Sequence, residues 1–290
     1  MPRLARAGAT VRLLRLAPSV SGDQSAPCML AAHAAPDDRA GEADACSSIG
    51  LDQLDAVVML AGVAPGRDRS RTLVAKNAAL ASGLCCALSS RPGVHLVHLS
   101  SDAVYHDCRE TITERSCTDS PSLYGVSHRV REAILGADGD SARDLLVIRS
   151  TMLYGDGDTH GAYGPNRFCR QALDERRVQL FGAGEDVRDY LAIEDLVELT
   201  VAALARRVVG CVNAASGEPA SARDVAETVA RATGARVEST PRRQPASVRT
   251  FDVTALRQMF PGLVPTPLAL GLERLIVGLR ARRSPPQPSA

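Results

Sequence analysis

A tyrosine and a histidine four residues apart, Tyr124 and His128, are the side chains in this sequence best suited to acid/base chemistry. Residues at positions i and i+4 of a helix lie on the same face, within reach of each other. A phenol can release and take back a proton, and an imidazole changes its charge near neutral pH. Taken alone, however, this spacing favours ordinary packing of two rings.

A second polar cluster, Ser100-Ser101-Asp102, directly follows the apolar run Val94–Leu99. In an open α/β sheet, ligands bind beyond the carboxyl ends of the strands, so hydroxyl groups at this position can meet a substrate. Serine and aspartate are also common caps at the start of a helix. A catalytic and a capping interpretation therefore both remain open for Ser101 and Asp102.

The elements that would position these side chains alternate between apolar runs and stretches with helical spacing. Strands are expected at Thr10–Leu16, Ala56–Ala61, Val94–Leu99 and Leu145–Ser150. Helices are expected at Lys76–Leu88 and Leu123–Leu135. This alternation predicts an α/β fold with a doubly wound parallel sheet.

The second half of the chain continues the pattern after a loop rich in Gly and Asp, Tyr154–Pro165. Its expected elements are the helices Asn166–Glu175, Ile193–Leu204 and Ala222–Thr233 and the strand Val178–Phe181. The helix Ala222–Thr233 has a cap signal at Ser221 and a stop signal at Gly234. Gly182-Ala183-Gly184 is interpreted as a turn, because no strand-helix-strand unit surrounds it as a phosphate site would need.

The composition excludes several classes of protein. With 290 residues, 45% hydrophobic and 23% charged, the chain is typical of a globular protein. A net charge of +1 and an aromatic content of 3% argue against a nucleic-acid partner, and no apolar run is long enough for a membrane span. The 8 cysteines form no Cys-x-x-Cys pair, so we expect no metal site and reduced thiols in a cytoplasmic protein.

The order of the motifs is more specific than any one of them. HLSSD at 98–102 is followed by SLYGVS at 122–127, IRSTMLYG at 148–155 and FGAGEDVRDY at 181–190. This series, from about Leu4 to Leu279, resembles the extended short-chain dehydrogenase/reductases, specifically the NAD(P)-dependent sugar-nucleotide epimerase/dehydratase family. The resemblance implies a Rossmann-like domain over residues 1–155, an interleaved substrate-binding lobe over 156–280 and a disordered tail over 281–290.

The resemblance also implies catalytic roles. Tyr124 would be the acid/base for a sugar hydroxyl, and Ser101 would share the hydrogen bond to that oxygen. A free phenol has a pKa of about 10, which the family lowers with a lysine four residues later; here that position is His128. An unperturbed imidazole is only about a quarter protonated at pH 7. Three alternatives follow: nearby acids raise the pKa of His128, the enzyme is slow, or the site binds without turnover.

The cofactor implied is NAD or NADP. The positions that correspond to cofactor contacts are Arg15, Ala61, Gly62, Asn77 and Ser100, together with Tyr124 and His128. Arg15 favours NADP, because an arginine suits its 2′-phosphate. For Asn77, a helix cap is the alternative interpretation.

The family's opening strand and G-x-x-G-x-x-G turn have no counterpart here. Residues Leu4–Arg15 resemble the end of the first helix and the second strand, so the sheet is expected to lack its first strand. Three explanations remain open: an upstream start codon, which we favour, a truncated inactive copy, or a rearranged sheet.

The substrate implied is a nucleotide-linked sugar. Asp102, Asn166, Arg188 and Arg242 correspond to substrate contacts, with surface ion pairs as the alternative interpretation of the two arginines. Ala103 stands where dehydratases of the family carry an acid, which favours epimerisation or keto reduction over dehydration. A homodimer formed through the helices Lys76–Leu88 and Leu123–Leu135 is also implied. The second hypothesis is a non-catalytic or degenerate relative that binds a nucleotide or a partner.

Overall fold

The computed structural model describes residues 14–15, 28–29, 54–60, 62–63, 72–91, 93–107, 110–136, 144–158 and 164–283. The chain forms two compact units. Unit 1 comprises Met1–Asp107, Glu114–Arg149 and Thr200–Val212, and unit 2 comprises Cys108–Thr113, Ser150–Leu199 and Asn213–Ala290. The chain therefore passes between the units several times, and each unit is built from segments far apart in the sequence.

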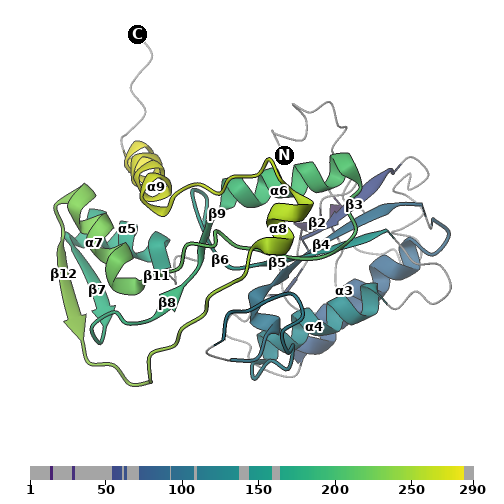
Figure 1. Ribbon diagram of the computed structural model, residues 1–290, viewed down its shortest axis with the longest axis horizontal. Helices are drawn as coiled ribbons and strands as arrows, with labels where there is room; N and C mark the ends of the chain where they lie inside the picture. Colours follow the sequence, from purple (N-terminus) through teal and green to yellow (C-terminus); the bar gives the residue numbers. More distant parts are fainter. Residues whose placement is uncertain are drawn as a thin grey trace, which may run out of the picture. The chain divides into compact units, whose positions relative to one another are not determined.

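The centre of unit 1 is a four-stranded sheet with the order β10-β5-β4-β3. Figure 1 labels its strands β5, β4 and β3. Its strands are β3 (Ala56–Met59), β4 (His95–Ser101), β5 (Leu145–Ser150) and β10 (Gly210–Ala214). Strands β3 and β4 are parallel, with Ala56 opposite His95 and Met59 opposite His98. Helix α3 (Thr72–Ala87) connects β3 to β4, and α4 (Leu123–Leu135) connects β4 to β5. The predicted α/β fold with a parallel, Rossmann-like sheet is confirmed.

The core of unit 1 shows why these segments form these elements. Val57 and Met59 of β3 belong to one buried apolar cluster, to which α3 contributes Leu80 and Leu84. Helices α3 and α4 pack against each other, and Leu135 at the end of α4 is fully buried. Because consecutive strand residues in β3 are buried, the strand must be covered on both faces, as its continuous apolar run predicted.

The N-terminal segment differs from the expectation. Only two short strands are described there, β1 (Leu14–Arg15) and β2 (Cys28–Met29), and they pair antiparallel in a sheet of their own. The expected strand Thr10–Leu16 thus contains a strand, but within the described residues it does not join the four-stranded sheet. Residues 4–13, which were expected to resemble the end of the family's first helix and the start of its second strand, lie outside the described residues.

The described part of unit 2 contains four helices, the first half of a fifth helix and several short strands. Helix α5 (Gly164–Glu175) leads into β7 (Arg177–Phe181), which pairs in parallel with β12 (Arg236–Thr240). Helix α7 (Ala222–Thr233) begins at a capping box formed by Ser221 and Asp224 and ends at Gly234, which has a φ of 70°. A left-handed C-cap of this kind favours glycine, so both sequence signals had a physical basis.

The remaining elements of unit 2 complete its core. Strands β6 (Met152–Tyr154) and β9 (Tyr190–Ala192) are parallel, and β8 (Val187–Arg188) pairs antiparallel with β11 (Ala220–Ser221). Helix α8 (Thr254–Met259) is short, and α9 (Leu268–Arg283) packs Leu272, Leu275 and Ile276 into the core. Helix α9 includes the first three residues of the expected tail, and 284–290 lie outside the described residues. Helix α6 (Ile193–Arg206) contains residues of both units.

Candidate active site

Ser101 is the last residue of β4 and the N-cap of a short 3-10 helix, η2 (Asp102–Val104). Its Oγ accepts a hydrogen bond from the backbone N–H of Ala103 at 3.1 Å and donates to Asp102 Oδ1 at 3.3 Å. The capping interpretation therefore describes how the side chain is held. The same cap fixes the hydroxyl at the carboxyl end of the central sheet, where a substrate oxygen can meet it.

The first turn of α4 lies against this segment because of a glycine. A Cβ on Gly125 would overlap the carbonyl oxygen of Ala103 and the Oγ of Ser120. The start of α4 is also fixed by Ser122, whose Oγ accepts a hydrogen bond from Gly125 N at 3.0 Å. Only glycine permits this approach, which brings the helical turn with Tyr124 against the chain that follows Ser101.

Tyr124 and His128 are in contact, as their spacing predicts. Their ring centroids lie 4.5 Å apart with an interplanar angle of 80°, an edge-to-face arrangement. Tyr124 is half-buried, and His128 is only 6% exposed. The buried imidazole of His128 therefore packs against the half-buried phenol ring of Tyr124.

His128 is neutral in the folded protein. Burial, the charge of Arg131 and the nearby His98 together lower the pKa of His128 from 6.5 to about 2. This excludes the alternative in which neighbouring acids raise its pKa. The physical reason is that the groups around the ring are cationic or uncharged, and an imidazolium here would lose its hydration.

Arg131 is a residue that the sequence analysis missed. One of its guanidinium nitrogens, Nη2, lies 2.8 Å from Nδ1 and 3.1 Å from Nε2 of His128. Burial lowers the pKa of Arg131 to about 10, while Tyr124 and Glu132 act in the opposite direction. The guanidinium therefore remains charged at neutral pH. Its position seven residues after Tyr124 was an available signal, but an arginine is unremarkable in a chain with 34 basic residues.

The positions expected to contact the cofactor are only partly described. Ala61 lies outside the described residues, and so does the side chain of Arg15. Gly62 follows β3, and a Cβ there would lie 2.5 Å from Nη1 of Arg131. Bare backbone at the end of β3 thus faces the guanidinium.

The side chain of Asn77 forms hydrogen bonds with the backbone of Val63, the residue after Gly62. Its Oδ1 accepts a hydrogen bond from Val63 N at 3.1 Å, and its Nδ2 donates to Val63 O at 3.1 Å and Leu73 O at 2.8 Å. Asn77 lies in the interior of α3, so the helix-cap interpretation is wrong. A buried amide that binds both backbone groups of one residue fixes the end of β3 instead.

Ser100 is directed into a buried polar network rather than towards the strand end. Its Oγ donates to Glu132 Oε1 at 2.6 Å. Arg149 binds the same carboxylate through Nε at 3.0 Å and Nη2 at 2.7 Å, and its Nη1 donates to the hydroxyl of Tyr105 at 3.0 Å. Burial disfavours the charge on Arg149, but the hydrogen bonds with Glu132 raise its pKa above the ordinary value. This network connects α4 with β4 and β5, and no local sequence pattern predicts it.

Unit 2 contains three of the residues expected to contact the substrate, Asn166, Arg188 and Arg242. Asn166, 3% exposed, accepts a hydrogen bond from Gly155 N at 3.0 Å and donates to Gly155 O at 2.7 Å. Arg188 donates from Nη2 to Ser247 Oγ at 2.6 Å and from Nη1 to Ser247 O at 2.9 Å. Asn166 thus holds a loop, while Arg188 is held by a neighbouring segment.

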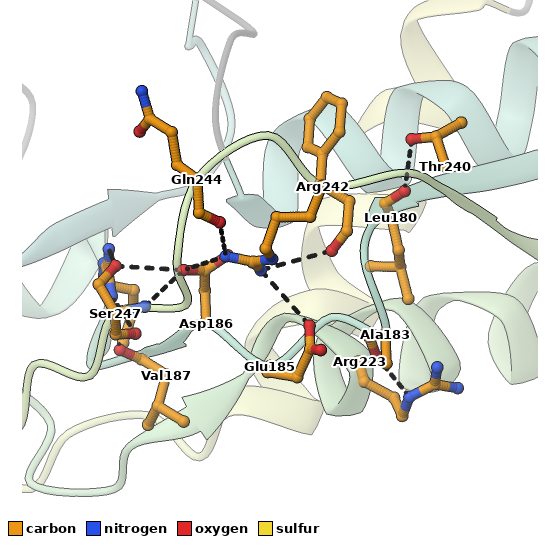
Figure 2. A network of polar contacts seen from close by, with 12 residues as sticks. Leu180, Ala183, Glu185, Asp186, Val187, Arg223, Thr240, Arg242, Gln244 and Ser247 are labelled. Carbon is orange, nitrogen blue, oxygen red and sulfur yellow. Dashed lines mark hydrogen bonds and ion pairs between the residues drawn. The ribbon is translucent and has the colours of Figure 1, made fainter.

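Arg242 forms ion pairs with two acidic residues at the surface of unit 2, in line with the alternative interpretation given above. Figure 2 shows its guanidinium between Asp186 and Glu185, with Nη2 at 2.5 Å from Asp186 Oδ2 and 3.5 Å from Glu185 Oε2. Asp186 also accepts hydrogen bonds from the N–H of Ser247 at 3.0 Å and its Oγ at 3.1 Å. Arg188 and Arg242 are therefore linked through Ser247 and Asp186.

A cavity of about 160 Å³ lies beside this network in unit 2. Its charged lining residues are Arg167, Asp186 and Arg188. The guanidinium of Arg167 lies 5.0 Å from the ring centroid of Phe168 and 5.3 Å from that of Phe181. Cationic groups and an exposed aromatic ring in one cavity suit an anionic ligand that carries a flat ring.

Residues 38–215, more than half of the chain, match the NAD dependent epimerase/dehydratase family. This chain belongs to that family. The NAD dependent NDP-hexosamine 5,6-dehydratase TunA has a similar structure, with 22% identity and a TM-score of 0.72 over 83% of this chain and 80% of that one. MoeE5 in complex with UDP-glucose and NAD is 25% identical, with a TM-score of 0.70 over 84% of each chain. UDP-glucuronic acid 4-epimerase from Bacillus cereus, in complex with UDP-glucuronic acid and NAD, is 22% identical, with a TM-score of 0.71 over 80% of this chain and 77% of that one.

The described residues fit the nicotinamide end of the cofactor that gives the family its name. The guanidinium of Arg131 fills the space beside Gly62, so these residues would offer the nicotinamide end the backbone that follows β3 and the phenol of Tyr124, which can donate a hydrogen bond. Within the described residues no cluster of His, Cys, Asp and Glu is arranged to hold a metal ion. None of the helices described is long and apolar enough to cross a membrane.

Proposed function

We propose that this epimerase/dehydratase family member is an NAD(P)-dependent epimerase or keto-reductase that acts on a nucleotide-linked sugar. The observation that carries the proposal is the contact made possible by Gly125, which holds the turn of Tyr124 against the segment after Ser101. A phenol and a hydroxyl on adjoining segments at the carboxyl end of the sheet can bind one substrate oxygen together.

Gly62, Tyr124 and His128 would hold the cofactor, together with Ala61 and Arg15. Ser100 would contact it through its backbone, because its hydroxyl is bound to Glu132, and Asn77 would act through the backbone that it fixes. A bound nicotinamide supplies the hydride acceptor and donor. We propose NADP as the preferred form, because Arg15 ends strand β1, where an arginine suits a 2′-phosphate.

The proton chemistry belongs to Tyr124 and Ser101. Ser101 orients the sugar hydroxyl, and Tyr124 in its phenolate form takes the hydroxyl proton as the carbon is oxidised. In the reverse direction, Tyr124 returns that proton to the oxygen of the ketone. Ala103 offers no acid at the position where dehydratases of the family carry one, and Asp102 is the one carboxylate within η2. This favours epimerisation or reduction over the loss of water.

The nucleotide part of the substrate would bind in the cavity of unit 2. Arg188 lines this cavity and provides a planar cation for a diphosphate. Arg242 would act through Asp186 and Ser247, which set the position of Arg188. Asn166 would shape the neighbouring loop through its two hydrogen bonds with Gly155.

The test is turnover of UDP-glucose and UDP-glucuronic acid with NAD(H) and NADP(H), preceded by calorimetric titration of each dinucleotide. Tyr124→Phe should abolish activity. Tyr154→Phe is the matched control, because the Tyr154 hydroxyl is buried without a hydrogen-bond partner, and it should retain activity. Turnover that needs only catalytic amounts of dinucleotide would indicate epimerisation. Consumption of one NADH or NADPH for each product molecule would indicate reduction. An active Tyr124→Phe variant would refute the mechanism.

A second candidate function is binding without catalysis. The observation in its favour is the neutral imidazole of His128, at the position where the family's lysine would carry a charge. Micromolar binding of a dinucleotide or a nucleotide sugar without any turnover by the folded chain would support it.

We also propose a homodimer that forms through α3 and α4, in which Leu123 is 41% exposed although it begins α4. Light scattering of the purified chain tests this. A cytoplasmic location is supported by Cys86 and Cys117, which form no disulfide with any described residue. Cell fractionation tests it.

A further inference from the structure

We propose that Arg131 provides the fixed positive charge beside Tyr124, and that His128 is the neutral acceptor that holds the guanidinium in place. This inference rests on the proposed role of Tyr124 as the acid/base. In the family that this chain resembles, a lysine at the position of His128 carries the positive charge that lowers the pKa of the tyrosine. In this chain, that positive charge would lie about one helical turn further along α4, on Arg131.

The helix geometry permits this substitution. Positions 124, 128 and 131 follow the i, i+4, i+7 pattern and so lie on one face of α4. Side chains on a helix lean towards its N-terminus, so the long side chain of Arg131 reaches back over His128 in the direction of Tyr124. The guanidinium accordingly lies 2.8 Å from one ring nitrogen of His128.

The hydrogen bond determines the charge state of the histidine. A neutral imidazole has one bare nitrogen that can accept from a guanidinium, whereas an imidazolium has none. Burial and Arg131 hold the pKa of His128 near 2, and the pKa of Arg131 stays near 10. At neutral pH the imidazole therefore accepts and the guanidinium carries the charge.

The surrounding elements hold the guanidinium in its place. Gly62 at the end of β3 leaves the space that Nη1 occupies, because a Cβ would approach it to 2.5 Å. From β4, His98 faces the cluster and is fully buried, with its pKa lowered to about 3 by burial and by Arg131, so it is also neutral. On α4 itself, Glu132 is bound by Ser100 and Arg149, and the one charged side chain of α3 is Lys76.

Electrostatics link the cation to the phenol. The interaction with Tyr124 raises the pKa of Arg131 against the effect of burial. By reciprocity, Arg131 stabilises the phenolate form of Tyr124. An opposite charge within several ångströms commonly shifts an ionisation by about one pKa unit or more.

The test is a spectrophotometric titration of Tyr124 in the unliganded protein. The chain has no Trp and 5 Tyr, so phenolate absorbance is not masked by indole. Burial raises the pKa of Tyr190 to about 12 and raises that of Tyr154 further, so both titrate late. The difference between wild type and Tyr124→Phe isolates the titration of Tyr124.

Three variants separate charge from structure. Arg131→Gln should raise the pKa of Tyr124 by about one unit, since it removes the cation. Arg131→Lys should keep the pKa close to that of wild type. The double variant His128→Lys/Arg131→Gln, which returns the charge to position 128, should restore it. The acidic limb of the kcat/KM–pH profile should shift in parallel.

An unchanged pKa of Tyr124 in Arg131→Gln would overturn the proposal. The proposal would also be wrong if Arg131→Lys raised this pKa as much as Arg131→Gln and the double variant did not lower it again. If Arg131→Gln fails to fold, Gly62→Ala provides the second variant, because its Cβ displaces the guanidinium; an unchanged pKa of Tyr124 there would overturn the proposal. An active Tyr124→Phe enzyme would refute the proposed mechanism instead, while the titration would still report on Arg131.

Discussion

Lowering the pH from 7 to 5 should weaken unit 1 through two buried histidines, His98 and His128. Their pKa values in the folded chain are about 3 and about 2, against 6.5 for a free imidazole. In this pH interval the unfolded chain binds protons at both rings and the folded chain binds none. A lowered folded pKa therefore gives stability that is complete above about pH 6.5 and is lost as the pH falls towards the folded values.

The size of the effect follows from the linkage relation. Each ring that takes up a proton only on unfolding lowers the free energy of unfolding by about 1.4 kcal/mol per pH unit below its unfolded pKa. Between pH 7 and pH 5 this amounts to about 2 kcal/mol per histidine and about 4 kcal/mol for both. A typical domain has about 5–15 kcal/mol in total, so the loss is large.

The assay is equilibrium urea unfolding at the two pH values, followed by tyrosine fluorescence. His128→Gln removes one of the two rings, so the loss of stability on acidification should fall by about 2 kcal/mol even if the variant is less stable at both pH values. His106→Gln changes an exposed ring and serves as the control, with the loss unchanged. A wild-type loss below about 1 kcal/mol, or an undiminished loss in His128→Gln, would refute the reasoning.

Three further outcomes can be checked by urea unfolding. Gly125→Ala should lower the free energy of unfolding by about 1–3 kcal/mol and abolish turnover, because its Cβ overlaps the carbonyl oxygen of Ala103. Gly83→Ala, which has open space around it in α3, should raise the free energy of unfolding by about 0.5–1 kcal/mol. Equal effects of the two changes would contradict the packing argument. Glu132→Gln should lower the free energy of unfolding by about 3–5 kcal/mol, because the charge of Arg149 stays buried without its carboxylate partner. The double variant Glu132→Gln/Arg149→Met should recover part of that loss, and no recovery would show that the ion pair is not the cause. Ser221→Ala should lower stability by about 1 kcal/mol through loss of the capping box of α7, and an unchanged midpoint would mean that the cap is dispensable.

Local patterns predicted the elements of this fold well. Leu123–Leu135, Leu145–Ser150 and Ala222–Thr233 have the bounds that periodicity and capping residues indicated. Periodicity predicts which face of a helix or strand is buried, and it can be read from the residues of each segment alone. The edge contact of Tyr124 and His128 followed from the same local rule.

Long-range pairings were beyond that rule. Arg149 and Glu132 meet from different elements, and β6 pairs with β9 across several intervening elements, so no spacing announces either contact. The antiparallel pairing of β1 with β2 was missed because the strand Thr10–Leu16 was assigned by likeness to a parallel sheet. Arg131 was missed because its role depends on the room left by Gly62, which only the fold reveals.

The two asparagine contacts have a consequence for how this protein can vary. Asn77 binds both backbone groups of Val63, and Asn166 does the same for Gly155, so a helix in each unit fastens the chain just beyond a strand. Each contact joins a helix directly to the backbone that follows a strand. These anchor points therefore do not depend on the length or the sequence of the segment that connects them. In a family whose members act on different substrates, such connecting segments are positions where a change of specificity costs the least in stability and where segments grafted from relatives should be accepted.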